Sequence, residues 1–231
     1  MITFRHAWLA ALAATLPSEG AWAQDMSGEI NLLELHTNFD ETNLVLDAAF
    51  ELRQNSRGLV LKAAGNGDIG PTMHELQAEG LLLQQIGSST ALLVGVRHDF
   101  RRGGDLSYAS VAATHDFTDW LVGETFAYLS EDGDLTGSGE FVAAIRVAEG
   151  LELEPRVGLL WSAQDIPRES FGTGPTELSA SVRLRRALTS GIDAYIGIIH
   201  DRLMSDTRKL ARAAGDSLQV TRGIIGMGFS F

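Results

Sequence analysis

The stretch TRGIIGMGFSF, Thr221 to Phe231, ends the chain and indicates its fold. With the two-residue period of a β-strand, one face is apolar and consists of Ile225, Met227, Phe229 and Phe231. The other face is small or polar and consists of Gly226, Gly228 and Ser230. Such a strand suits a wall with hydrocarbon outside and a crowded interior, and a terminal aromatic ring suits the boundary of an outer-membrane barrel.

The same alternation recurs along the chain in segments of roughly ten residues, each followed by a turn or loop. The predicted strands are 29–38, 43–53, 58–64, 74–86, 89–99, 106–116, 119–130, 139–147, 150–162, 176–187, 191–203 and 218–231. That makes about twelve, an even number as expected for a single-chain bacterial barrel. We find no amphipathic helix of useful length after the N-terminal leader.

The connections between these segments alternate in length. The short ones read QNSR, GSS, FT, AEG and LTS, and the longer ones include GNGDIGPTM, EDGDLTGSG, AQDIPRESFGTGPT and MSDTRKLARAAGDS. This pattern predicts an all-β, antiparallel, up-and-down transmembrane barrel with tight periplasmic turns, longer external loops and both termini in the periplasm. A soluble β-sandwich also has many short strands, but it has no reason to segregate its loops in this way.

The N-terminus carries the apolar run AWLAALAATL after Arg5 and His6, followed by AWAQ with small residues at Ala21 and Ala23. This predicts a secretory signal peptide over residues 1–24 and a barrel over 25–231. An N-terminal membrane anchor is the alternative, but the apolar run is about half of the ~20 residues that a spanning helix needs. Export of a barrel predicts the outer membrane of a Gram-negative bacterium, with its lipid as a partner.

The composition limits the partners further. The chain has 30 acidic and 18 basic residues, for a formal net charge of −12, and no cysteine. The acidic balance argues against nucleic acid as a partner. Without cysteine there is neither a disulfide framework nor a thiolate metal site.

Two neighbouring predicted strands carry charges on one face only. In GLELEPRVGLLW and TELSASVRLRRAL the charged positions are Glu152, Glu154, Arg156, Glu177, Arg183 and Arg185. If the strands pair antiparallel, Glu154 lies opposite Arg183 and Glu152 opposite Arg185, which predicts a ladder of ion pairs inside a narrow barrel. The alternative is an acidic lumen that concentrates cations, formed by Glu152, Glu154, Glu177, Asp193 and Asp201.

Several of these segments together resemble a known family. The runs LELEPRVGLLWSAQD, GTGPTELSASVRLR, AYIGI and DTRKLARAAGDSLQVTRGIIGMGFSF, with GVRHDF and ETNLVLDAAFELR upstream, are similar to copper resistance protein B, an outer-membrane protein of bacterial copper-tolerance operons. The similarity covers most of residues 29–231, and KLARAAGDS is its most specific part. It implies copper ions as the ligand and periplasmic copper-resistance proteins as possible partners.

The chain departs from that family at its N-terminus. Family members typically begin with a segment rich in methionine and histidine, whereas DMSGEINLLELHTNF has only Met26 and His36. The best local pair for copper is Met73 with His74, because thioether sulfur favours Cu(I) and imidazole binds either oxidation state. Two ligands do not make a closed site.

Other chemistry has little support in the sequence. The dipeptides His98-Asp99, His115-Asp116 and His200-Asp201 cannot converge on one ion or substrate within regular strands, because adjacent side chains point to opposite faces. Neither a nucleophile–base spacing nor a glycine-rich phosphate loop is present, so we expect no enzyme. The sequence therefore predicts a barrel that binds or passes copper in copper resistance. The alternative is a small plugged barrel with a structural or general permeation role.

Overall fold

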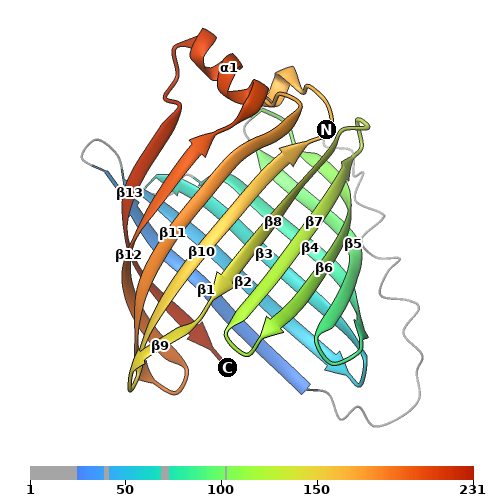
Figure 1. Ribbon diagram of the computed structural model, residues 1–231. Coiled ribbons are helices and arrows are strands. Elements are labelled where there is room, and N and C mark those ends of the chain that lie inside the picture. Colours follow the sequence, from blue (N-terminus) through green and yellow to red (C-terminus); the bar gives the residue numbers. More distant parts are fainter. Residues whose placement is uncertain (1–24, 39–41, 69–72, 102) are drawn as a thin grey trace, which may run out of the picture.

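The computed structural model describes residues 25–38, 42–68, 73–101 and 103–231 (Figure 1). The predicted signal peptide, residues 1–24, lies outside this part of the chain. Within the described residues, no helix is both long and apolar enough to cross a membrane.

The described chain is almost entirely β-structure. The strands are β1 Asp25–Thr37, β2 Thr42–Gln54, β3 Arg57–Asp68, β4 Met73–Ile86, β5 Thr90–Arg101, β6 Leu106–Thr118, β7 Leu121–Ser130, β8 Leu135–Ala143, β9 Ile145–Ala148, β10 Leu151–Ser162, β11 Gly174–Thr189, β12 Ile192–Leu203 and β13 Gln219–Ser230. β8 and β9 both pair with β10 and are separated by one residue, so together they act as one interrupted strand. The thirteen strands therefore form a twelve-stranded barrel. The predicted fold and strand number are confirmed.

The sheet closes on itself, and among the described strands only the four-residue β9 pairs on one side alone. All neighbouring strands are antiparallel, β10 pairs with β11, and β13 pairs with β1. At this last seam the amide of Gly28 donates to the carbonyl of Phe231 at 3.0 Å, and the amide of Phe231 donates back at 2.9 Å. Closure satisfies the backbone groups that an open edge would expose to lipid. The final residue thus forms part of the ring of hydrogen bonds.

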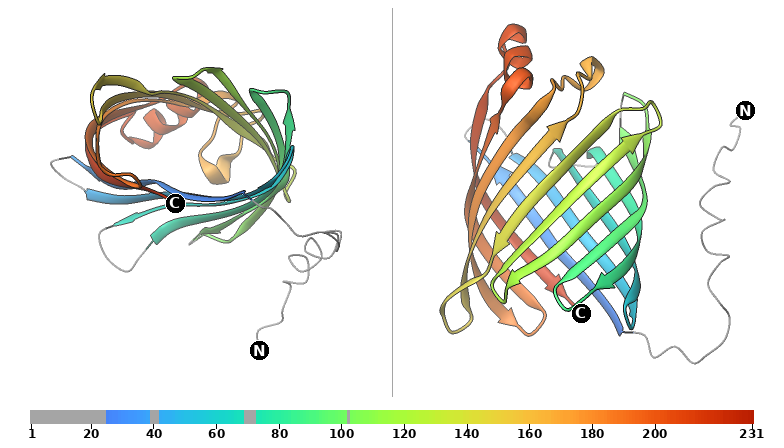
Figure 2. Two further views of the ribbon diagram at one scale, coloured as in Figure 1. Left: turned by 90° about the horizontal axis from the view of Figure 1, so that it is seen from below. Right: turned by 45° about the vertical axis from the view of Figure 1, so that its right-hand side comes forward.

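The two ends of the barrel differ as predicted. Short turns after β2, β4, β6, β9 and β11 lie at the end that carries the C-terminus, and the longest connections, 163–173 and 204–218, lie at the opposite end (Figures 1 and 2). One predicted loop was too long. β8 begins at Leu135, so the connection to β7 is only the turn 131–134 and LTGSG belongs to the strand.

The prediction that no amphipathic helix follows the leader was wrong. Helix α1, Ser205–Ala214, lies inside the 204–218 connection, and a short 3₁₀ helix η2, Pro167–Glu169, lies in the other long connection. Gly215 ends α1 with a φ of 84°, a conformation that suits glycine. A ten-residue helix is marginal by itself, so its contacts with the neighbouring loop stabilise it.

The wall has an apolar outer face. Val94, Val111, Ile196 and Ile225 point outward and are 55%, 58%, 60% and 61% exposed, whereas Leu81 and Arg183 point inward and are buried. The interior is not uniformly polar as the alternation suggested. On the inner side of β3 to β7 an apolar cluster consists of Val60, Leu81, Leu83, Ala91, Leu93, Ala112 and Phe126. Side chains fill a barrel this small, and they can pack against each other without contacting water.

Candidate lumen site

The predicted charge ladder lies on the inner wall of β10 and β11. Glu152 is the Cα partner of Arg185, and Glu154 is that of Arg183. The ion pairs run diagonally instead of straight across. Glu154 joins Nε of Arg185 at 2.7 Å and Nε of Arg156 at 2.8 Å, one oxygen to each.

Two further residues of the predicted charge ladder, Glu152 and Glu177, do not take part in these ion pairs. Among the described residues, no ion pair joins Glu152 or Glu177 to a basic side chain. Both are half-buried on the inner wall. The structure therefore brings Glu154, Arg156 and Arg185 together and leaves these two carboxylates outside the group.

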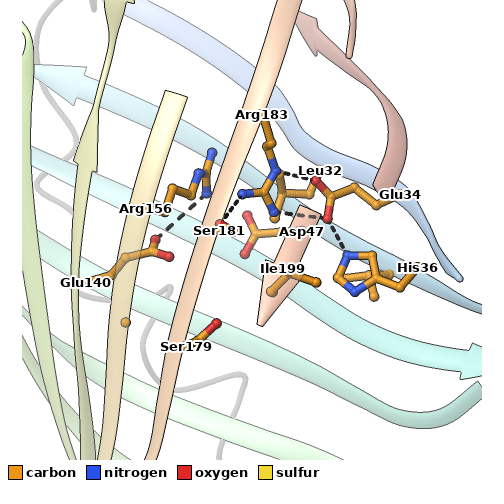
Figure 3. A pocket seen from close by; sticks show the side chains of 12 residues that line it. Leu32, Glu34, His36, Asp47, Glu140, Arg156, Ser179, Ser181, Arg183 and Ile199 are labelled. Carbon is orange, nitrogen blue, oxygen red and sulfur yellow. Dashed lines mark hydrogen bonds and ion pairs between the residues drawn. The ribbon is translucent and has the colours of Figure 1, made fainter. Parts of the chain in front are cut away.

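Arg183 reaches a partner that the sequence did not suggest. Its Nε and Nη2 donate to the two carboxylate oxygens of Glu34 on β1, at 2.6 and 3.1 Å (Figure 3). Oε2 of Glu34 also lies 2.5 Å from Nε2 of His36. Both charged side chains of the Arg183–Glu34 pair are buried, so the pair stabilises the lumen only while both partners are present.

Further carboxylates on the inner wall are held by arginine in the same way. Asp99 binds Arg97 through two hydrogen bonds of 2.6 and 2.7 Å, Asp193 binds Arg185 at 2.7 Å, and Asp201 binds Arg222 at 2.9 Å. The Arg185 guanidinium also stacks on Tyr195, 4.1 Å from the ring centroid. Of the predicted cation-attracting set, Glu154, Asp193 and Asp201 are thus already neutralised.

Between these arginine-bound carboxylates the lumen contains two cavities. The larger, about 260 Å³, is lined by residues that include Glu34, His36, Asp47, Glu140, Arg156 and Arg183 (Figure 3). The smaller, about 140 Å³, is lined by residues that include Asp47, Lys62, Glu79, Arg97, Glu124 and Tyr128. Asp47 lines both, so the two spaces adjoin at this carboxylate.

Four carboxylates that line these cavities, Asp47, Glu79, Glu124 and Glu140, lack the short arginine contacts that hold Glu34 and Glu154. The nearest basic atom to Glu140 is Nη1 of Arg156 at 3.8 Å, and Lys62 lies 3.9 Å from Glu124. Asp47 accepts a 3.3 Å hydrogen bond from the Asn31 amide. Glu124 and Glu140 are also direct Cα partners on β7 and β8. Like charges opposite each other on one face repel, so this part of the lumen favours a cation between them.

The predicted metal pair cannot be assigned to this region. Met73 and His74 open β4 at the end of the barrel with the long connections, but their side chains lie outside the described part. Across the side chains that are described, no three His, Asp or Glu residues converge closely enough to hold a metal ion. His36 has Glu34 as its neighbour, and that carboxylate is already bound to Arg183.

The His-Asp dipeptides divide between the two faces. His98 binds Ser107 while Asp99 binds Arg97, and His200 binds Thr221 while Asp201 binds Arg222. His115 binds Thr90. None of the three histidines shares a partner with the aspartate that follows it, which agrees with their expected opposite directions.

Sequence reasoning missed Glu34, His36, Asp47, Glu124 and Glu140. Each lies on the inward parity of its strand, so alternation could have placed it in the lumen. Alternation could not have shown which carboxylates an arginine neutralises. Arg183 and Glu34 are 149 positions apart in the sequence and meet only because the barrel closes.

The fold and the charged lumen define a class, the porin-like barrels of bacterial outer membranes. The NanC porin superposes with a TM-score of 0.57 at 14% identity, covering 89% of this chain and 99% of that chain. The KdgM porin gives a TM-score of 0.52 at 13% identity with the same coverage. At this level of identity the similarity concerns the fold alone.

The family follows from the sequence match. The model described as "Copper resistance protein B precursor (CopB)" matches residues 25–231, and the chain belongs to the copper resistance protein B family. A copper resistance protein B homolog of Pseudomonas syringae pv. tomato is 23% identical over 73% of this chain and 57% of its own length. Copper resistance protein B of Escherichia coli is 26% identical over 68% of this chain and 52% of its own length. The chain thus spans about half the length of these relatives.

Proposed function

We propose that this barrel acts in copper tolerance by passing copper ions across the outer membrane, or binding them there. Membership of the copper resistance protein B family supports copper as the ion. The observation that carries the proposal is the pair of adjoining cavities lined by Asp47, Glu124 and Glu140, none of which is held by an arginine as Glu34 or Glu154 is.

This arrangement favours passage over storage. A permeating ion must be attracted strongly enough to enter and weakly enough to leave, which successive incomplete sites allow and a closed chelate does not. The described side chains provide carboxylates without a three-ligand cluster. A partly hydrated cation would move between Glu140, Asp47 and Glu124. The buried ion pairs, such as Arg183–Glu34, would keep the wall rigid.

The proposal places the mature barrel, residues 25–231, in the outer membrane after removal of residues 1–24. Its partners are the surrounding lipid, copper ions and periplasmic copper-resistance proteins. Faster gel migration of the unheated protein would support an intact barrel, and release of the leader would appear as a lower mass.

The test is complementation of a copper-sensitive strain that lacks its own homologue. We expect the wild-type chain to change growth on copper, and the double variant Glu124→Gln/Glu140→Gln to lose most of this effect. Glu149→Gln, on the exposed turn after β9, is the matched control. Copper retained by the purified barrel distinguishes binding from passage. If wild type leaves tolerance unchanged and retains no copper, the proposal is wrong.

A second candidate is a small plugged barrel with a structural or general permeation role. It is favoured by the apolar cluster around Leu81 and by the many paired charges, which together fill much of the interior. This candidate predicts copper tolerance that does not depend on Glu124 or Glu140. It also predicts conductance that does not distinguish copper from other small ions.

A further inference from the structure

The connection between β10 and β11 lies across one opening of the barrel. We call residues 163–173 the strap. Seen from below, the strap with its helix η2 lies within the outline of the barrel wall, beside α1 (Figure 2, left). It belongs to the end of the barrel opposite the C-terminus (Figure 1).

The first attachment of the strap is to the turn between β7 and β8. The Arg168 guanidinium forms ion pairs with both Asp132 and Asp134. Nε2 of Gln164 donates to Oδ1 of Asp134 at 3.1 Å. The turn that links two neighbouring strands therefore holds the strap through its acidic side chains.

The second attachment reaches a more distant part of the wall. Nη1 of Arg101, at the end of β5, lies 3.0 Å from Oε1 of Glu169. Three strands, β6, β7 and β8, separate β5 from β10 around the barrel. A strap that joins them must pass over the opening instead of following the rim.

The third attachment is to helix α1. The amide of Gly172 donates to Oγ1 of the buried Thr207 at 2.9 Å. A Cβ atom at Gly172 would lie 2.5 Å from Cβ of Asp206, so only glycine allows this close approach. Asp165 also binds the backbone and hydroxyl of Thr173, both at 2.8 Å, which ties the two ends of the strap together.

The attachments differ in how easily they are broken. The Arg168 pairs are at the surface, with 45% of the Arg168 side chain exposed, and solvent-exposed ion pairs of this kind contribute little to stability. The base of the strap is held by the Gly172–Thr207 hydrogen bond to α1 and by the buried Ile166, which is 3% exposed. The Arg168 contacts can therefore open while the base remains attached.

We propose that the strap is a gate over the outer opening, held closed by Arg168 on the β7–β8 turn and by Glu169 on Arg101, and that its release admits small solutes to the lumen cavities. The inference concerns access and does not depend on copper as the ion. A barrel that gates potassium ions but does nothing for copper tolerance would contradict the proposed function and leave the gate intact.

The test is conductance of the full barrel in planar bilayers with potassium chloride. We expect the double variant Arg168→Ala/Glu169→Gln to spend severalfold more time in an open state than wild type. Arg57→Ala, beside the short turn at the opposite end, is the matched control and should behave as wild type. Migration of the unheated protein on a gel verifies that each variant has formed a barrel.

Cross-linking tests the same gate in the opposite direction. The chain has no cysteine, so Asp132→Cys/Arg168→Cys can be joined by a short bis-maleimide without background reaction. We expect the cross-linked barrel to conduct less than the same protein before reaction, while each single-cysteine variant is unaffected. Equal conductance before and after cross-linking, or a double variant that opens no more than wild type, overturns the gate.

Discussion

Arg183 of β11 and Glu34 of β1 form a bidentate ion pair that is almost completely excluded from solvent, with 3% and 0% of their side chains exposed. β12 and β13 lie between the two strands, so the pair spans the seam where the C-terminal strand meets the N-terminal one. The seam is therefore held by side chains in the lumen as well as by the Gly28–Phe231 backbone bonds.

The first prediction concerns this pair. Arg183→Met leaves Glu34 buried without its arginine and with only His36 beside it, and removal of one member of a buried pair costs about 3–5 kcal/mol. Unfolding in urea, followed by gel migration of the unheated protein, should show the loss. Arg186→Met, an exposed arginine on the same strand, should cost far less. Glu34→Met/Arg183→Met should recover much of the stability, and a double variant no more stable than Arg183→Met would contradict the explanation.

The second prediction concerns a glycine in the wall. A Cβ atom at Gly95 would lie 1.9 Å from the carbonyl oxygen of Gly80 on the neighbouring strand, so neither backbone can yield without loss of pairing. We expect Gly95→Ala to lower the free energy of unfolding by about 1–3 kcal/mol through overpacking. Gly103→Ala, where no atom lies within 4 Å of the new Cβ, is the control. Equal stability of the two variants would show that the wall adapts at Gly95.

The third prediction concerns pH and the strap. Hydrogen bonds from the Thr173 hydroxyl and backbone hold the pKa of Asp165 below its usual value. Because the folded-state pKa is lowered, the contribution of Asp165 is present above the unfolded pKa and is lost as the pH falls through the folded pKa. The Thr173 amide resonance should titrate with a midpoint below that of an ordinary aspartate. Asp165→Asn should abolish this titration, and a midpoint at or above the ordinary value would contradict the assignment.

The fourth prediction concerns ion selectivity. Asp47 lines both cavities and has a neutral amide as its hydrogen-bond partner. Asp47→Asn should shift the reversal potential in a potassium chloride gradient toward lower cation selectivity. Asp119→Asn, on an exposed turn between β6 and β7, should leave it unchanged. An unchanged potential in Asp47→Asn would mean that ions bypass the cavity junction.

Much of this fold could be predicted because alternation is a local property. The outward Ile225 and Met227 and the inward Gly226 follow from the pleat of one strand, and the Glu154–Arg183 register follows from a single hairpin. Helix α1 was missed because a ten-residue helix depends on neighbours such as Gly172, which the local pattern does not reveal.

By itself, the sequence determined the antiparallel β-barrel fold, the approximate positions of the strands and the difference in loop length between the two ends. It also indicated the copper resistance protein B family. Only the tertiary structure decided which carboxylates in the lumen are not neutralised by an arginine and can attract a cation. Arg183 selects Glu34 over its nearer Cα partner Glu154, and Glu124 faces Glu140, because closure of the barrel brings distant strands within ion-pair distance. The energy of an ion pair falls off over a few ångströms. Which carboxylates of the lumen lack an arginine partner therefore depends on distances in the folded barrel and not on sequence order.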